Sequence, residues 1–321
     1  MAILDNHRLR QQAADKLDAA SNQKKLVLVF VCVTAVLSLL IGIVNVILDS
    51  QIAGTGGLGG LQMRSTLATA QTLLNIALWV FVPFWNLGYT SVALKLGRGE
   101  NASETDLLNG FRRFGPGLRL MLLQLVIYFA VIFVAVQVGS ILFAMTPWSE
   151  PFYQQLETVS LDATGNMDEA ALLALIPAMI PFWIIVGTLS LVAFIPVTYR
   201  LRMAEFCLMD NPKCGALVAL LQSNRMMKGN CINLFKLDLH FWWFYLATFL
   251  IPLLCYGDVL LPLAGVNLPF DPMVSFFLFY VASQAAQVLL YWRCRNLVEC
   301  TYVGAYDTLS AEQVLPSPWN N

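Results

Sequence analysis

The stretch NGFRRFGPGLRLMLLQLVIYFAVIFVAV, residues 109–136, decides the fold because it changes abruptly from basic and glycine-rich to continuously apolar. Its first part places Arg112, Arg113 and Arg119 around a Gly-Pro-Gly sequence. Its second part is apolar for long enough to enter a helix that crosses a bilayer, which takes about 20 residues. Proline and glycine interrupt helices. We therefore predict a hinge between a short helix along the membrane surface and a membrane-spanning helix.

The composition is that of a membrane protein. The 321 residues are 58% hydrophobic and only 12% charged, with a mean hydropathy of +0.66, whereas soluble chains carry about 25% charged residues. The seven cysteines form no CxxC pair, and most lie in or beside apolar runs. We expect buried thiols rather than a disulfide framework or a metal site. The polar N-terminal segment lacks the features of a signal peptide.

The apolar runs predict an all-α fold, a polytopic bundle of six transmembrane helices. Backbone groups in lipid must be hydrogen-bonded internally, so long apolar runs form helices. The predicted spans are residues 26–48, 65–94, 118–145, 171–199, 233–256 and 272–292. They define a transmembrane domain over residues 26–306, preceded by an amphipathic cytoplasmic segment (1–25) and followed by a cytoplasmic tail (307–321).

Basic residues are concentrated on one side of this six-span arrangement. Of the 19 lysines and arginines, only Arg64 falls on the other side, where the connections are acidic. Because cytoplasmic loops carry the excess of Lys and Arg, both termini are predicted to be cytoplasmic. The candidates for topology determinants and for contacts with anionic lipid headgroups are Lys24, Lys25, Arg112, Arg113, Arg119, Arg225 and Lys228.

Three amphipathic stretches, residues 14–25, 105–117 and 215–229, precede spans and end in basic residues. We expect them to form interfacial helices on the cytoplasmic side. The second and third align at an offset of 113 residues, which pairs Pro83 with Pro196 and Arg112 with Arg225. The alignment favours parallel repeats, each made of an interfacial helix and two spans.

Three motifs resemble a known family: LGYTSVALKLGRGE (87–100), LLNGFRRFGPGLRL (107–120) and LLQSNRMMKGNCINLFKL (220–237). Together they resemble the bacterial integral membrane family called domain of unknown function 975, which is typical of Firmicutes. That family is distantly similar to the membrane domain of some glycerophosphodiester phosphodiesterases. The resemblance covers nearly the whole chain and implies a bacterial plasma membrane location, but the family name implies no activity.

The sequence holds no recognisable catalytic or cofactor-binding arrangement. GTGGLGGL (54–61) lacks the Lys-Ser/Thr of a phosphate-binding loop, so we interpret it as a flexible turn. The two histidines, His7 and His240, belong to no HExxH motif, and no GxSxG sequence marks a nucleophile. We therefore predict a protein that is not an enzyme and has no cofactor, metal or nucleic-acid partner.

One charged cluster falls near the start of the fifth predicted span, in KLDLHFWW (236–243). Lys236 and His240 share a helix face, and Asp238 lies between them in sequence. Ionisable groups in membranes are candidates for ligand, ion or proton sites. Alternatively, Lys236 extends to the interface, Asp238 pairs with Arg119 or Arg225, and the tryptophans join an interfacial belt.

Polar amides are predicted deeper in the spans. They are Asn45, Asn75, Asn86, Gln124, Gln137, Gln284 and Gln287, the last two being one helical turn apart. Such amides form hydrogen bonds between helices or line a polar path. Arg295 and Glu299 are four residues apart beyond the last predicted span, where we interpret them as ordinary helix-surface support.

Four functions remain open. The first is a non-enzymatic role in lipid interaction, assembly or envelope homeostasis, with anionic headgroups as partners. The second is a transporter or exporter of small molecules, ions or peptides, which predicts a polar cavity reaching the bilayer centre. The third is a lipid-modifying enzyme, which needs converging acid, base or metal ligands. The fourth is a bacteriocin-immunity-like or partner-binding role through the acidic connection 146–169. The protein partners, if any, stay unknown.

Overall fold

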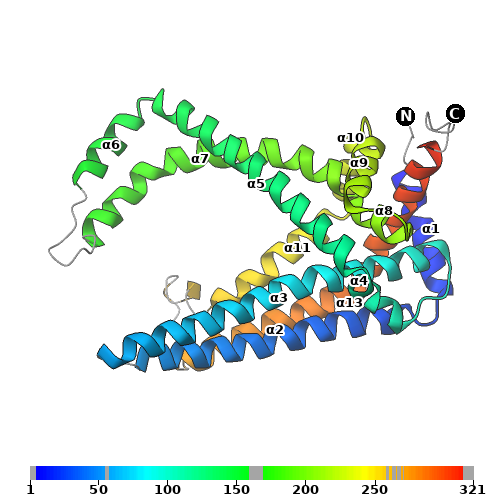
Figure 1. Cartoon of the computed structure of the whole chain (residues 1–321), viewed down its shortest axis with the longest axis horizontal. Coiled ribbons are helices and arrows are strands. Elements are labelled where there is room, and N and C mark those ends of the chain that lie inside the picture. Colours follow the sequence, from blue (N-terminus) through cyan, green and yellow to red (C-terminus); the bar gives the residue numbers. More distant parts are fainter. Residues whose placement is uncertain are drawn as a thin grey trace. The chain divides into compact units, whose positions relative to one another are not determined.

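The computed structural model describes residues 5–54, 58–158, 169–257, 260–261, 265, 269 and 271–313. The described elements are helices, which confirms the all-α prediction (Figure 1). The chain divides into two compact units, Met1–Leu118 with Met203–Asn321 (unit 1) and Arg119–Arg202 (unit 2).

Unit 1 contains most of the helices. They are α1 (Asn6–Ala19), α2 (Gln23–Gly54), α3 (Leu58–Arg98), η1 (Glu104–Leu108), α4 (Asn109–Arg112), α8 (Ala204–Asp210), α9 (Ala216–Met227), α10 (Cys231–His240), α11 (Trp242–Leu253), η2 (Leu254–Tyr256) and α13 (Pro272–Gln313). Unit 2 contains most of α5 (Phe114–Ala144), with α6 (Ser149–Thr158) and α7 (Glu169–Leu201). Within unit 2, α6 packs against α7.

Five helical stretches among the described residues are long and apolar enough to cross a membrane. They are Gln23–Leu48, Met63–Arg98, Phe114–Ala144, Leu175–Asp210 and Val274–Ala311. Cys231–His240 and Trp242–Tyr256 together make a sixth if they form one span, although they meet at a bend of 69°. Length and composition thus support a bundle of membrane-spanning helices.

The bend interrupts the region in which the sequence predicts one continuous span, 233–256. Phe241 leaves the helical conformation, with φ −111° and ψ 17°. Its ring is 2% exposed, and the guanidinium of Arg10 lies 5.7 Å from the ring centre. Burial of this ring among other elements fixes the change of direction, which helical periodicity alone does not reveal.

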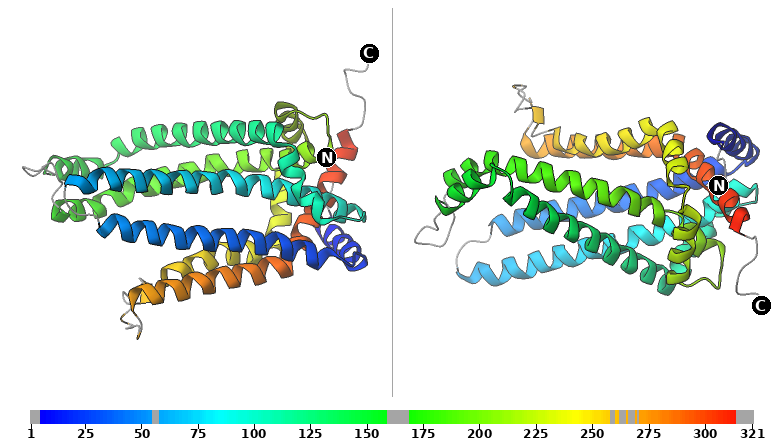
Figure 2. Two further views of the ribbon diagram at one scale, coloured as in Figure 1. Left: turned by 60° about the horizontal axis from the view of Figure 1, so that its bottom comes forward. Right: turned by 90° about the horizontal axis from the view of Figure 1, so that it is seen from above.

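Three long helices of unit 1, α2, α3 and α13, run side by side, as both views of Figure 2 show. Their shared core is aromatic at the end next to α1. The rings of Phe30 and Trp85 stack at 5.6 Å, and Tyr89 lies 4.5 Å from Phe30. Trp85 Nε1 also donates a hydrogen bond of 3.0 Å to the Phe30 carbonyl oxygen. Ring packing therefore fixes the register of α2 against α3.

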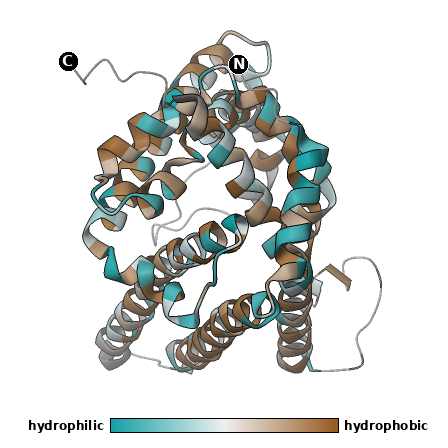
Figure 3. Ribbon diagram, turned by 90° about the vertical axis from the view of Figure 1, so that its right-hand side faces the viewer, coloured by the Kyte–Doolittle hydropathy of each residue, from teal (hydrophilic) through white to brown (hydrophobic). Residues whose placement is uncertain are grey.

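Short helices gather around this end of unit 1. Figure 3 looks onto it and shows hydrophilic residues on the short segments, whereas the long helices behind are mostly hydrophobic. We call η1, α4, α8, α9, α10, α1 and the last turns of α13 the collar. Arg98, at the end of α3, joins two elements of the collar, because its guanidinium bonds Asp210 of α8 at 2.5 Å and Asp307 of α13 at 2.7 Å.

The opening stretch of the sequence forms a tight corner of the collar. A Cβ atom on Gly88 would overlap the Leu107 carbonyl oxygen, and one on Gly110 would overlap the Phe84 carbonyl oxygen. The backbones of α3 and of η1–α4 therefore touch directly. A break follows, but it lies at Arg113 rather than at the predicted Gly-Pro-Gly hinge, because Gly115, Pro116 and Gly117 belong to the first turn of α5, where proline is tolerated.

We expect Gly88→Ala to lower the stability of unit 1 by about 1–3 kcal/mol, because overpacking displaces the η1 backbone. Gly115→Ala is the matched control, because a Cβ there meets nothing within 4 Å and alanine favours the helix. Thermal unfolding of the detergent-purified protein measures both variants. Equal midpoints for the two would contradict the close approach of the backbones.

Asp106 gives the collar a pH dependence. Burial raises the pKa of its carboxyl, but hydrogen bonds from Lys95 Nζ (2.8 Å) and from the Ser103 backbone and hydroxyl outweigh this and hold the pKa below its usual value. A lowered folded-state pKa stabilises the fold above the unfolded value, about 4, and the contribution is lost as pH falls through the folded value.

Asp106→Asn is therefore expected to lower the unfolding midpoint at pH 7, and the difference from wild type should shrink as the pH falls below about 4. Asp15→Asn, which removes an exposed carboxylate on α1, controls for the loss of one charge. Denaturant unfolding at each pH measures the effect. A difference between wild type and Asp106→Asn that stays constant with pH would argue against this coupling.

Candidate functional site

The basic residues predicted to contact lipid have two kinds of surroundings. Lys24, Arg112, Arg119, Arg225 and Lys228 are exposed. Arg113 instead serves the collar, because its Nη1 donates to the carbonyl oxygens of Leu208 and, at 3.0 Å, of Asn211. Lys25 forms an exposed ion pair of 2.6 Å with Glu104. The exposed five are therefore the members of this set best placed to meet headgroups.

The structure separates the members of the predicted Lys236–Asp238–His240 cluster. Lys236 and His240 are exposed, and His240 Nδ1 donates to the Lys236 carbonyl oxygen at 2.8 Å. Asp238 lies elsewhere, next to two tyrosines. The Tyr302 hydroxyl donates to Asp238 Oδ1, and the Tyr245 hydroxyl lies 3.4 Å from the same oxygen. This cluster does not form one three-residue site.

Asp238, Tyr245 and Tyr302 form a network across the 69° bend, since they belong to α10, α11 and α13 respectively. The two tyrosine hydroxyls are 2.6 Å apart, and Tyr302 is 2% exposed. Buried polar groups of this kind are retained when they are hydrogen-bonded to one another. The network ties the two arms of the bend to α13.

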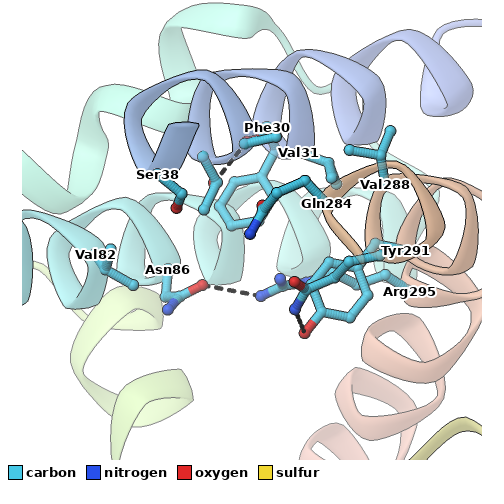
Figure 4. Close-up of a pocket in the computed structure, with 12 residues that line it drawn as sticks. Phe30, Val31, Ser38, Val82, Asn86, Gln284, Val288, Tyr291 and Arg295 are labelled. Atoms are coloured by element: carbon cyan, nitrogen blue, oxygen red, sulfur yellow. Dashed lines mark hydrogen bonds between the residues drawn. The ribbon is translucent and has the colours of Figure 1, made fainter. Parts of the chain in front are cut away.

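The deep amides lead to a polar cavity between α2, α3 and α13, with a volume of about 260 Å³ (Figure 4). Its lining residues are Phe30, Val31, Thr34, Ala35, Ser38, Val82, Asn86, Gln284, Gln287, Val288, Tyr291 and Arg295. Gln284 and Gln287, which the sequence marked as one turn apart, thus both line it. Gln287 Nε2 donates to the Tyr291 hydroxyl at 3.3 Å.

Arg295 carries the charge of this cavity. Its Nη2 donates to Asn86 Oδ1 at 3.0 Å, as Figure 4 shows. Its guanidinium carbon lies 4.4, 4.6 and 5.1 Å from the ring centres of Phe30, Tyr89 and Tyr291. Rings at these distances stabilise a cation that has left water. Arg295 Nε is buried and has no hydrogen-bond partner among the described residues.

The cavity reaches well into the predicted span. Along α2, Phe30 and Ser38 lie five and thirteen residues beyond Lys25. At 1.5 Å per residue they are about 8 and 20 Å from that exposed lysine. The hydrocarbon core is about 30 Å thick, so the stretch of α2 from Lys25 to Ser38 is long enough to cover more than half of that thickness.

A second cavity, of about 360 Å³, lies on the other side of Arg295. It is lined by Asn86, Thr90, Glu205, Phe206, Phe244, Tyr245, Thr248, Tyr291, Arg295 and Glu299. Asn86, Tyr291 and Arg295 line both cavities. Tyr245 lines this second cavity, and its hydroxyl donates to Asp238. Asp238, one residue of the predicted cluster, is therefore linked to the cavity through Tyr245.

Sequence reasoning placed Arg295 on a helix surface and so missed its role. The signal is present, because Gln284, Gln287, Tyr291, Arg295 and Glu299 recur at intervals of three and four residues on α13. Hydropathy hides it, since the charged residues after Trp292 resemble the end of a span. The helix instead continues to Gln313, and its polar face turns inward.

Other predictions fall partly outside the described residues. The turn at GTGGLGGL includes residues 55–57, and the acidic connection 146–169 includes 159–168, which lie outside them, as do the tail residues 314–321. Among the described residues no group of three His, Cys, Asp or Glu is placed to hold a metal ion. Asn45 and Asn75 bond each other at 3.2 Å across α2 and α3.

Comparison with known proteins gives one match. A family described as protein of unknown function (DUF975) matches residues 1–295, which confirms the resemblance found from the sequence motifs. Comparisons with curated proteins and with solved structures give no match.

Tyr302→Phe is expected to lower the unfolding midpoint by a few degrees, because the half-buried Asp238 carboxylate loses the hydrogen bond from Tyr302, and loss of such a bond costs about 1–3 kcal/mol. Tyr256→Phe removes a hydroxyl from an exposed residue and should leave the midpoint unchanged. Thermal unfolding followed by tryptophan fluorescence makes the comparison. Identical midpoints would show that the Asp238 network does not stabilise the bend.

Proposed function

We propose that this chain, which belongs to the family described as protein of unknown function (DUF975), is a multi-pass membrane protein that binds the anionic group of an amphiphile around Arg295. The apolar helices long enough to cross a membrane support the membrane setting. The two cavities that meet at Arg295 support the binding role.

The observation that carries the proposal is the state of the Arg295 guanidinium. A charged side chain among membrane helices is costly and is retained where it has a function. Arg295 is held in place by Asn86 and three rings, yet its nearest carboxylate, Glu299, is 3.9 Å from Nε, beyond hydrogen-bond distance. A guanidinium has five N–H donors, and an anionic group in the cavity would accept from those that remain.

The apolar surroundings favour an amphiphile over a water-soluble anion. Val31, Val82 and Val288 line the first cavity beside the polar groups. The outward faces of α2 and α13 are apolar as well, with Leu40 and Leu289 more than half exposed. A headgroup at Arg295 would therefore have its acyl chains in contact with apolar side chains and lipid.

The collar supports the same role from the membrane surface. With the predicted orientation, the exposed Lys24, Arg112, Arg225 and Lys228 lie at the cytoplasmic leaflet. Each such residue near an anionic leaflet contributes about 1 kcal/mol of attraction. The collar would raise the local concentration of anionic lipids beside the helices that enclose Arg295. Binding and orientation, rather than catalysis, is the activity that we propose.

A specific observation also favours a second role, passage of the bound molecule. Arg295 lines both cavities, so a ligand released from one side of its guanidinium meets the other. Lipid translocation in vesicles, followed by quenching of a fluorescent phosphatidylglycerol, tests this role. Arg295-dependent translocation would support transport, whereas binding without translocation would leave a lipid-binding function.

Arg295→Gln is expected to weaken binding of dihexanoylphosphatidylglycerol about tenfold or more, because a buried charge-assisted hydrogen bond is lost. Arg293→Gln is the matched control, since Arg293 is exposed on the same helix. Native mass spectrometry of the detergent-purified protein measures the bound lipid. Equal affinity in wild type and Arg295→Gln would reject the site.

A further inference from the structure

We propose that the headgroup bound at this site is zwitterionic, with a cationic amine a few ångströms from its anionic group. The inference rests on the proposed function and names the class of amphiphile. It comes from a difference between the two cavities that share Arg295. The first cavity contains one charged residue, Arg295, whereas the second adds the carboxylates of Glu205 and Glu299.

Of the two carboxylate residues that line the second cavity, Glu205 and Glu299, the one beside Arg295 is Glu299. It lies one helical turn beyond Arg295 on α13, and its Oε1 is 3.9 Å from Arg295 Nε. This separation is longer than a hydrogen bond, so the two groups do not satisfy each other. The Arg295 and Glu299 side chains are only 15% and 27% exposed. A positive charge and a negative charge therefore stand side by side, each with bonding capacity left.

The hydroxyl groups of the second cavity present oxygen atoms to it. Thr248 Oγ1 donates its proton to the Phe244 carbonyl oxygen at 2.8 Å, and Thr90 Oγ1 donates to the Asn86 carbonyl oxygen at 3.1 Å. A hydroxyl whose proton is used in this way can only accept from a ligand. With the Glu299 carboxylate, these oxygens suit an N–H donor.

Aromatic rings complete the surroundings expected for a cation. Phe206, Phe244 and Tyr291 line the same cavity, and the rings of Phe244 and Tyr291 lie 6.0 Å apart. The faces of such rings attract ammonium groups. The second cavity thus combines a carboxylate, acceptor oxygens and rings, the chemistry that recognises an amine.

The first cavity suits the other half of the headgroup. The Asn86 side-chain oxygen, Oδ1, already accepts a hydrogen bond from Arg295 (Figure 4). An anionic group facing the cavity meets the guanidinium and the side-chain amides of Gln284 and Gln287, all of which can donate. With a phosphate next to Arg295 and an amine next to Glu299, each charge of the headgroup would lie beside a side chain of opposite charge.

The test compares dihexanoylphosphatidylethanolamine, which has the amine, with dihexanoylphosphatidylglycerol, which lacks it. We expect the wild type to bind the ethanolamine lipid about tenfold more tightly, and Glu299→Gln to abolish that preference by weakening the ethanolamine lipid selectively. Arg295→Gln should weaken both lipids, and Arg293→Gln neither. Native mass spectrometry of the full-length protein in detergent gives the affinities.

Each result decides the inference separately from the proposed function. Equal binding of the two lipids by the wild type, or equal losses in Glu299→Gln, would overturn the zwitterionic assignment alone. Loss of neither lipid in Arg295→Gln would overturn the site itself. Thr248→Val removes one acceptor oxygen without a charge change, so a smaller loss specific to the ethanolamine lipid is expected even if Glu299→Gln does not fold.

Competition with glycerophosphoethanolamine, the headgroup without acyl chains, identifies the source of the charges. An amphiphile site predicts that this soluble molecule competes only at concentrations at least about a hundredfold above the lipid, because the acyl chains contribute about 0.8 kcal/mol per buried methylene. Competition at equal concentration would overturn the amphiphile and indicate a soluble zwitterion.

Discussion

The guanidinium of Arg295 can remain among apolar helices only because aromatic rings and one amide surround it. Phe30 and Tyr89 come from α2 and α3, so the same rings that hold these helices together also hold the charge. Desolvation of an unaccompanied arginine would cost several kcal/mol. The helix packing and the site are therefore one structure, and the position of α13 between its neighbours follows from both.

The collar keeps that arrangement in register at the end of the long helices. Arg98 joins α3 to α8 and α13, and Asn296 Nδ2 donates to the Gln23 carbonyl oxygen at the start of α2. Tyr89 donates to the Oδ1 of the same Asn296. Polar side chains gather where helix ends meet, because the backbone N–H and C=O groups of the terminal turns have no partner within the helix and need water or a polar side chain.

Much of the fold could be predicted from the sequence, because the bilayer imposes a simple rule on composition and length. The apolar runs are local properties and are readable without tertiary information, whereas the break at Arg113 lies two residues before the Gly-Pro-Gly sequence that predicts it. The bend at Phe241 and the continuation of α13 to Gln313 are not local. A buried ring decides the first. At the end of α13, charged residues terminate the apolar run, but the helix continues because its backbone N–H and C=O groups are hydrogen-bonded within the helix.

The site was only partly predictable for the same reason. Gln284 and Gln287 could be chosen as polar residues at helical spacing, but which face of α13 meets α2 and α3 depends on packing. That packing turns Arg295 from the apparent end of a span into the centre of two cavities. Asp238 shows the opposite: the sequence groups it with Lys236 and His240, but its tyrosine partners come from α11 and α13. A charged residue at the boundary of an apolar run is therefore a stronger candidate for a membrane site when amides precede it on the same face.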